Sequence, residues 1–508
     1  MIPARQKADP LASWLALLDV TRFRIADWIF FLGVFQVLFY LPSGILHVYL
    51  GNLVYTRDLL VMVNNALLIW FLFYRQNRHV PLSYVIPLAL LVVAILPGAF
   101  EGVERRNFML IGKWIAIWSF CILFGFHTLM NMTRRHTVLF FGIIMVYLSV
   151  DSLVGFAESK RIFLYNRYIL SEESTAFGRS VVGNRQLTAS WLRLNGLERG
   201  AFDFASTMAL GWTLSWVAVV QIKFTNFKTT LLRLMFCALG LWFAYMCILS
   251  GGRSGLVGIG TLAPLVVMTL FGWHRNSLLM RGYMVFLWVA MFLLMFVDFP
   301  ALIGTIAMLL FGDLPIASIH STIERIYWWG LLFDDFQRHP SILVNGYLWT
   351  QVFTDYVSFI RVWDNQALWM LFYGGIPVYF SFHLLFISSI PRLPKLPEGR
   401  KVPAFYYAYI VLLAYQFGES FPREALLLPT NYALLFTLGM NLALQEQLRR
   451  NPRLAPMILG LIPQMPPPRP QGWGPGGPED SWGAPRPPSQ SPGRRPAQAP
   501  GLRPPLPR

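Results

Sequence analysis

Long apolar runs separated by short polar turns fill most of this sequence. A run of about 20 predominantly apolar residues is long enough to cross the hydrocarbon core of a bilayer as a helix. The pattern therefore predicts an all-α polytopic membrane protein with about twelve transmembrane helices. The candidate spans begin near residues 27, 57, 81, 108, 136, 203, 230, 254, 282, 366, 403 and 425.

Polar stretches divide the chain into three parts. Residues 1–26 lack a short apolar core followed by a small-residue cleavage site, so they predict a cytoplasmic N-terminus without a cleavable signal peptide. Residues 27–450 form the transmembrane domain, which includes two long polar segments, 156–202 and 300–365. The first of these is expected to form short helices on the membrane surface. Residues 451–508 are rich in Pro, Gly and Arg and predict a disordered cytoplasmic tail.

Basic residues in the short turns predict the orientation. If the spans alternate in direction, these residues all fall on one side of the membrane, which the positive-inside rule assigns to the cytoplasm. The two long polar segments then lie on the outer face, the second as a large loop before the span near residue 366. The basic residues are Arg22, Arg24, Arg75, Arg78, Arg134, Arg135, Lys223, Lys228, Arg275, Arg281, Arg392, Lys395, Arg400, Lys401, Arg449 and Arg450.

Composition agrees with this pattern and excludes an ordinary soluble domain. The chain has 508 residues, of which 55% are hydrophobic and 13% are charged, whereas soluble domains carry about 25% charged residues. The net charge of +17 fits basic cytoplasmic loops better than nucleic-acid binding, so no nucleic-acid partner is expected. The cysteines Cys121, Cys237 and Cys247 lie in apolar runs without metal-ligand spacing, which indicates packing residues.

The turn ILSGGRSGLVGIG at 248–260 is the first candidate for chemistry. Its glycines allow a sharp turn and a close approach of helices. Arg253 lies in this turn, directly before the span near residue 254, and a guanidinium beside a helix N-terminus suits a diphosphate. On local sequence alone, an arginine that reaches toward lipid headgroups explains the residue equally well.

The segment 313–366 is the second candidate, because it is polar and aromatic between long apolar runs. Within it, ERIYWWGLLFDDFQRHP predicts an amphipathic helix that starts at Arg325 and ends at His339 and Pro340. Asp334 and Asp335 are expected on its solvated face rather than at a metal. The apolar positions of the helix are Trp328, Leu331, Leu332 and Phe336.

Asp364 and Asn365 lie directly before the span near residue 366. At this outer boundary an aspartate can accept a proton from an attacking hydroxyl, although position alone favours a helix N-cap. Few strong charges are expected in the middle of the spans. This distribution favours a site open to the outer leaflet over a conduit through the bilayer.

Taken together, these segments resemble the O-antigen ligase and polymerase superfamily of bacterial surface-polysaccharide assembly. The resemblance rests on SGGRSG, on ERIYWWGLLFDDFQRHPSILVNGYLW and on DNQALWMLFYGGIP, with a weaker match at RLNGLERGAFDF. Asn365 and Gly375 keep the spacing of the ligase motif, but Asp364 stands where ligases carry the catalytic histidine. That departure favours the polymerase branch.

The resemblance implies a GT-C-like helical fold in the bacterial inner membrane, with the active site facing the periplasm. It implies metal-independent, inverting glycosyl transfer without a cofactor, in which undecaprenyl-diphosphate-linked repeat units are joined into O-antigen or exopolysaccharide. Partners would be the lipid-linked glycan, membrane lipid, and flippase and chain-length regulator proteins. On this basis Asp364 is the candidate base with His339 in reserve, and Arg253, Arg325 and Arg193 are the candidates for binding the diphosphate.

Three alternatives remain open at the level of sequence. A ligase would transfer the glycan to lipid A-core, for which the missing histidine is unfavourable. A glycosyltransferase that uses polyprenyl monophosphate sugars would place an acidic residue in its first outer loop, where only Asp58 stands at the edge of a short turn. A polysaccharide flippase or transporter would need a charged central cavity.

Overall fold

The computed structural model describes residues 23–41, 56–80, 85–86, 88–89, 105–160, 194, 197–198, 201–222, 225–250, 253–294, 329–346, 366–393, 402–420 and 429–450. The chain divides into two units, Met1–Leu461 and Ile462–Arg508, and all described residues belong to the first. The predicted tail 451–508, most of the N-terminus 1–26 and most of the two outer segments lie outside the described residues.

The described residues are mostly helical and include no β-strand. Helices begin within five residues of each predicted start except the one near residue 81, where 85–86 and 88–89 alone are described as helical. The helices are α2 (Ile25–Tyr40), α4 (Thr56–Ile69), η3 (Trp70–Arg75), α6 (Arg105–Asn131), α7 (Arg134–Ser159), α10 (Ala201–Gln221), α11 (Phe227–Leu249), α12 (Arg253–Gly260), α13 (Ala263–Leu270), η4 (Trp273–Arg275), α14 (Ser277–Leu294), α17 (Pro340–Asn345), α20 (Gln366–Ser388), α21 (Ala404–Ser420) and α22 (Pro429–Arg450).

Four helical stretches among the described residues are long and apolar enough to cross a membrane: Asp58–Arg75, Arg134–Ser159, Asp203–Gln221 and Phe227–Leu249. The last of these, α11, turns large apolar side chains outward, and Leu241 is 72% exposed. Such an exposed apolar face indicates a lipid environment. A membrane protein with several spanning helices fits these observations, while the number of twelve spans stays a prediction.

The span expected near residue 254 is broken into two short helices, α12 and α13. Thr261 lies at the break, and its hydroxyl donates to the carbonyl of Gly258 at 2.7 Å or that of Ala414 at 2.8 Å. Pro264 follows in the first turn of α13, where its missing N–H costs no hydrogen bond. The helix predicted near residue 254 therefore begins where expected but is interrupted at Thr261.

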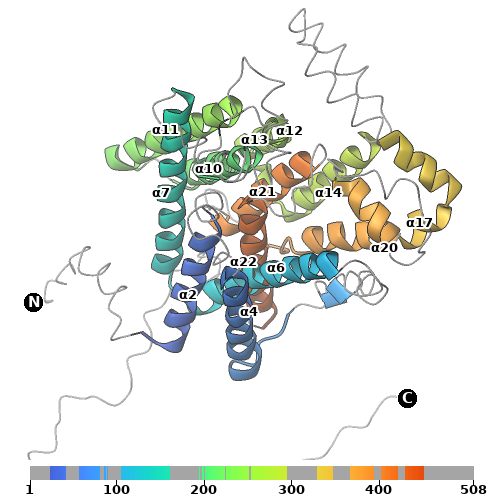
Figure 1. Cartoon of the computed structure of the whole chain (residues 1–508). Helices are drawn as coiled ribbons and strands as arrows, with labels where there is room; N and C mark the ends of the chain where they lie inside the picture. The colour runs from blue at the N-terminus through green and yellow to red at the C-terminus, as the bar shows by residue number, and fades with distance from the viewer. Residues whose placement is uncertain are drawn as a thin grey trace, which may run out of the picture. The chain divides into compact units, whose positions relative to one another are not determined.

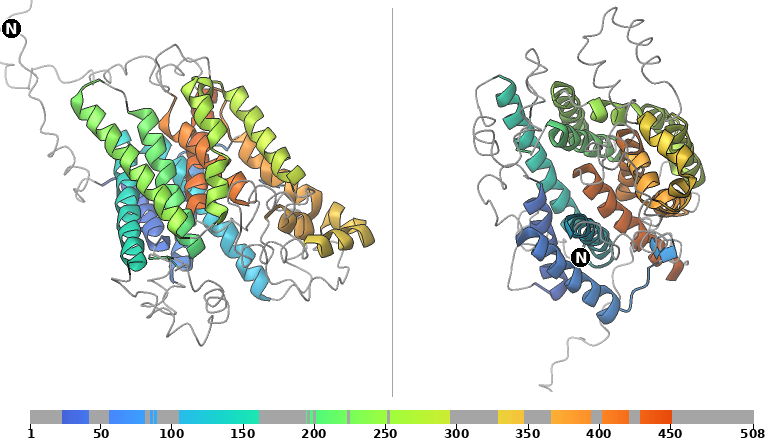
Figure 2. Two further views of the ribbon diagram at one scale, coloured as in Figure 1. Left: turned by 90° about the horizontal axis from the view of Figure 1, so that it is seen from above. Right: turned by 45° about the vertical axis from the view of Figure 1, so that its right-hand side comes forward.

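Helices α21 and α22 lie among the other helices of the bundle (Figure 1 and Figure 2). Residues of α21 from Tyr406 to Glu419 are buried without interruption. The crossing of α6 and α22 is especially close: a Cβ on Gly125 would lie 1.9 Å from the carbonyl oxygen of Phe436, and one on Gly439 would lie 1.9 Å from that of Ile122. Glycine is required at both positions because the two backbones touch.

Hydrogen bonds join the helix ends that carry the basic turn residues Arg24, Arg75, Arg281 and Arg449, and His136 Nε2 near the start of α7 lies 3.9 Å from Asp27 Oδ1 on α2. We call this the basic end of the bundle. His127 on α6 contacts the carbonyl of Ala26 on α2 at 3.0 Å. Four other pairs link neighbouring helix ends there, and for the helices that they join this agrees with the predicted alternation of direction, which stays a prediction for the chain as a whole. The pairs are Gln76 with Asn131, Gln221 with Val402, Arg281 with Ile390, and Gln445 with Ser389.

The opposite end of the bundle carries buried or half-buried acidic residues, and we call it the acidic end. It includes Asp58, Asp151, Glu158, Glu198 and Glu419. Tyr40 at the end of α2 donates to Asp58 at the start of α4, with 2.8 Å between the two oxygens. The sequence predicts that this end faces the periplasm; that orientation stays a prediction.

Candidate functional site

The predicted site residues are only partly described. Asp364, Arg193 and Arg325 lie outside the described residues. Arg253 is the first residue of α12, and the structure describes its backbone alone. His339 precedes α17 and is half-buried. The geometry of the candidate site is therefore built from the elements that position these residues.

The predicted amphipathic helix is present over 329–338. Leu332 and Phe336 are buried, whereas Asp334 and Arg338 are exposed. Asp335 is also buried, at 7% exposure, so the expected solvated face is wrong for Asp335. The reason is helical geometry, because Asp335 lies three residues after Leu332 and shares its face.

His339 ends this helix and begins the next one. Its backbone N–H donates to the carbonyl of Asp335 at 2.8 Å, and its own carbonyl accepts from the N–H of Ile342 at 2.9 Å. Pro340 then opens α17, where a proline is favourable. These bonds give His339 a structural role in the backbone and leave its predicted catalytic role as a prediction.

Helix α17 packs on the kink of α20 (Figure 1). The kink is at Gly375, which has φ +64° and ψ −166°. This conformation is essentially restricted to glycine, because a side chain would be strained in it. A Cβ there would lie 2.6 Å from the carbonyl oxygen of Val344 and 2.7 Å from the backbone nitrogen of Gly346. The segment after His339 and the segment after Asp364 are thus joined through their backbones, which explains the glycine.

The start of α12 lies where three other helices converge. A Cβ on Gly255 would be 2.9 Å from Sγ of Cys247 on α11, 3.6 Å from the hydroxyl of Tyr415 on α21 and 3.7 Å from Cβ of Ala205 on α10. Gly258 meets the ring of Tyr415, at 2.5 Å from such a Cβ. The close approach predicted for this glycine-rich turn is confirmed, and it fixes the backbone of Arg253 at the acidic end.

A buried polar cluster lies beside this point, between α7, residues 197–198 and α10. Asp151 Oδ1 accepts from the backbone N–H of Leu197 at 2.7 Å. The hydroxyl of Tyr147 donates to Glu198 Oε1 at 2.7 Å, and that of Thr207 lies 3.4 Å from the same oxygen. Asp151 Oδ2 is buried without a described hydrogen-bond partner, so this cluster has unused hydrogen-bonding capacity.

The cluster and the start of α12 flank the first turns of α10. Phe204 fills the space at Gly155 on α7, where a Cβ would lie 2.3 Å from Cζ of that ring. Ala205, the next residue, faces Gly255 on α12. Adjacent residues of α10 therefore contact both neighbours, and the acidic end brings the two regions close together.

Sequence reasoning missed Asp151 and Glu158, and the expectation of few charges within the spans is wrong for α7. A signal was available in the spacing of the residues. Tyr147, Asp151 and Glu158 stand at intervals of four and seven, which places them on one helical face. Asp151 and Glu158 are 0% and 1% exposed in a helix that otherwise turns much of its apolar surface outward.

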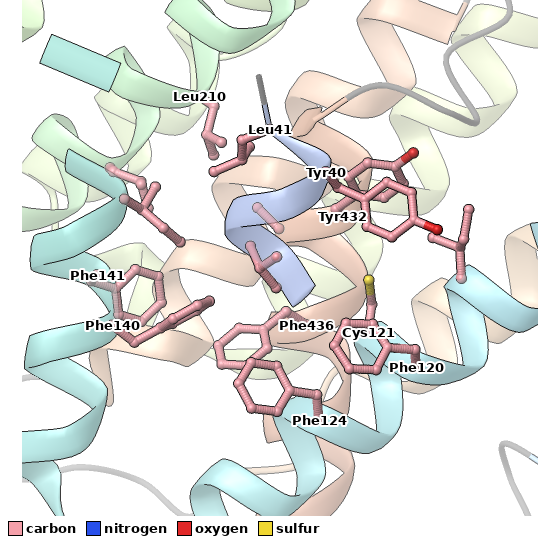
Figure 3. Close-up of a pocket in the computed structure, with 15 residues that line it drawn as sticks. Tyr40, Leu41, Phe120, Cys121, Phe124, Phe140, Phe141, Leu210, Tyr432 and Phe436 are labelled. Atoms are coloured by element: carbon pink, nitrogen blue, oxygen red, sulfur yellow. The ribbon is translucent and has the colours of Figure 1, made fainter. Parts of the chain in front are cut away.

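An apolar pocket lies between α2, α6, α7, α10 and α22 (Figure 3). Its volume is about 40 Å³, and its lining contains no charged residue. Phe124 and Phe140 lie toward one end and Tyr40 and Tyr432 toward the other. The lining suits hydrocarbon and is unsuited to a sugar or an ion.

Within the described part of the chain, no group of three or more His, Cys, Asp or Glu residues is arranged to hold a metal ion. No known protein family, curated protein or solved structure matches this chain. The resemblance to the O-antigen ligase and polymerase superfamily therefore stays a hypothesis that depends on the quoted motifs.

Proposed function

We propose that the chain is a membrane glycosyltransferase that polymerises undecaprenyl-diphosphate-linked repeat units at the periplasmic face. The single observation that carries this proposal is the convergence at the acidic end of the bundle. The backbone of Arg253 enters that end between α10, α11 and α21, beside the buried cluster of Asp151 and Glu198. A site for a charged lipid carrier needs such a polar region at the edge of an apolar bundle.

Transfer of a glycan from its lipid carrier breaks the bond between the anomeric carbon and a diphosphate oxygen. The acceptor hydroxyl forms the new bond with inversion, its proton passes to a base, and the diphosphate leaves with the bonding electrons. In this proposal Asp364 is the base, with His339 in reserve, and Arg253, Arg325 and Arg193 stabilise the leaving charge. Fixed guanidinium groups lower such a barrier because the charge develops as the bond breaks.

The packing of α17 on Gly375 supports the same assignment. It ties the segment that follows His339 to the helix that begins after Asp364. A base and its reserve would thus be carried by two segments whose backbones are held together. The apolar pocket beside α7 and α10 offers a hydrocarbon environment in the same bundle.

The test replaces Arg253, Arg325 and Asp364 singly in the native host, with exposed Arg338→Gln as the matched control. Each site variant is expected to accumulate single repeat units on the lipid carrier while the protein stays folded, and Arg338→Gln to make polymer of normal length. Long polymer that never reaches lipid A-core would establish a ligase instead. Loss of lipid-linked repeats from the outer leaflet would contradict both enzymatic functions.

A transporter is the second candidate, because of one specific observation. Asp151 is fully buried within a candidate membrane span and keeps an oxygen without a described hydrogen-bond partner. Intramembrane carboxylates of this kind often serve ion or proton coupling. A proton gradient that drives glycan transport into vesicles containing only this protein would favour the transporter.

A further inference from the structure

Two guanidinium groups pair with one carboxylate at the basic end of the bundle, and the charge of a third, Arg78, lies near enough to interact with them. Glu446 near the end of α22 has a fully buried side chain that pairs with Arg450, and its Oε2 lies 3.2 Å from Nη2 of Arg449. Arg450 also donates from Nη2 to the carbonyl of Asn77 at 3.0 Å. This last bond brings Arg450 next to Arg78, so three positive charges face a single negative charge.

The chain holds Arg78 in place through neutral partners. Asn77 has φ +49°, and after it the backbone N–H of Arg78 donates to the carbonyl of Leu72 at 3.0 Å. Its Nε donates to Oε1 of Gln76 at 3.4 Å, and Gln76 in turn donates to Asn131. Among the residues that the structure describes, no carboxylate lies within ion-pair distance of Arg78.

The electrostatics of Arg78 are unfavourable without a further anion. Burial and the neighbouring Arg450 guanidinium both lower the pKa of Arg78, and the Glu446 carboxylate opposes them. Two cations held near each other repel, and an added negative charge between them would remove that repulsion. The excess of positive charge around Arg78 and Arg450 therefore favours a ligand of negative charge.

Neighbouring side chains indicate the depth of this site in the membrane. The candidate span Asp58–Arg75 ends here, with Trp70 42% exposed and Tyr74 83% exposed. The Arg75 guanidinium carbon lies 5.9 Å from the centroid of the Trp70 ring. Exposed tryptophan and tyrosine at the end of a span mark the level of the lipid headgroups. The phosphates of lipid headgroups are the anions that a membrane supplies at that level.

We infer that Arg78 and Arg450 bind the phosphate of an anionic phospholipid headgroup at the basic end of the bundle. The site does not depend on the proposed glycosyl transfer, because it lies at the opposite end from the acidic cluster. The bound headgroup would stabilise the joint between η3 and α22, which Arg450 already makes through Asn77.

The test measures lipid retention by native mass spectrometry on the full-length protein in detergent micelles. The wild-type protein is expected to retain phosphatidylglycerol in preference to phosphatidylcholine. Arg78→Gln should weaken phosphatidylglycerol binding by about fivefold and leave phosphatidylcholine unchanged. Arg450→Gln combined with Glu446→Gln is the second variant, which removes the Arg450 guanidinium without changing the net charge, and it should also weaken phosphatidylglycerol binding.

The matched control is Arg134→Gln, which removes an exposed arginine from the start of α7 at the same end. It should retain phosphatidylglycerol as the wild type does. Equal retention of both lipids by the wild type, or an equal loss in Arg134→Gln and Arg78→Gln, would overturn the site. Displacement of the lipid by inorganic phosphate at millimolar concentration would show that the site binds a free anion and would contradict the proposed phospholipid site.

Discussion

The two ends of this helix bundle use buried polar groups differently. At the basic end, hydrogen bonds run in one direction from Arg78 to Gln76, Asn131 and His127, and His127 completes the chain at the carbonyl of Ala26. A neutral imidazole that donates from Nε2 and accepts at Nδ1 satisfies both of its contacts.

At the acidic end, the polar groups are only partly paired. One carboxyl oxygen of Asp151 accepts from the backbone N–H of Leu197, and the other is buried without a described hydrogen-bond partner. Native structures pair nearly all buried polar groups, so an exception calls for an explanation. At the basic end Arg275 Nε is also buried without a described hydrogen-bond partner, so the contrast is between two groups of residues. The chain from Arg78 to Ala26 fastens helices together, whereas the cluster around Asp151 keeps hydrogen-bonding capacity for a ligand.

The largest expected effect comes from a substitution that pushes α6 and α22 apart where they cross. Gly125→Leu would place a side chain against the carbonyl of Phe436, where even a Cβ would lie at 1.9 Å. Because backbone cannot yield as a flexible side chain can, we expect a loss of about 4 kcal/mol or more in the free energy of unfolding. Yield and thermal unfolding of the purified protein measure it.

Gly142→Ala is the control for that substitution. Gly142 lies on α7, where an added Cβ would meet open space, and alanine favours a helix over glycine. We expect unchanged or slightly higher stability, by about 0.5–1 kcal/mol. An equal loss of stability in Gly125→Leu and Gly142→Ala would show that the close α6–α22 crossing is not needed for the stability of the bundle.

The next largest effect is expected at Gly375, beside the acidic end. Gly375→Ala forces a Cβ into a backbone conformation that suits glycine and against Val344 and Gly346, at a cost of about 3 kcal/mol. Polymer formation should be lost along with the packing of α17. Thermal unfolding and product length measure the two effects, and Gly282→Ala, which meets open space on α14, should change neither.

At the basic end, His127→Ala should lower the free energy of unfolding by about 1–3 kcal/mol, because it removes the partner of Asn131 and of the carbonyl of Ala26, both of which are partly buried. Polymer made per folded molecule should not change. Denaturant unfolding and product analysis measure these quantities separately. A variant that unfolds normally but makes no polymer would show that the basic end is part of the site.

Much of the helical pattern could be predicted from the sequence. Helix starts such as those of α2, α10 and α21 follow directly from apolar run length, because a membrane span must satisfy its backbone internally. The break between α12 and α13 could not be predicted in this way. At the break the Thr261 hydroxyl can donate to the carbonyl of Ala414, which is 153 residues distant in the chain, as well as to that of nearby Gly258.

The site was less predictable because its residues depend on tertiary contacts. The glycines around Arg253 carried a local signal for close packing, and the structure confirms that packing. Asp335 was expected in solvent, yet the helix places it beside buried Leu332. Glu198 could not be identified from the sequence, because its partner Tyr147 is 51 positions away in the chain.

Asp151→Asn is expected to change stability least, and it gives the sharpest test of the comparison between the basic and acidic ends. Asp151→Asn keeps an oxygen that can accept from the N–H of Leu197, and it replaces a fully buried carboxyl group with an amide of the same shape. We therefore expect the free energy of unfolding to change by less than about 1 kcal/mol. Polymer formation should fall by about tenfold to a hundredfold, because the cluster positions the chain near Glu198 beside the start of α12.

Asp334→Asn is the matched control, since it removes a carboxylate from the segment 329–338 without disturbing a buried contact. It should leave both stability and polymer length unchanged. Asp151→Asn could instead destabilise the protein as His127→Ala does, while polymer per folded molecule stays normal. The acidic end would then also serve to hold helices together. The two ends would then be alike, and the ligand-binding role of the acidic end would be lost with their difference.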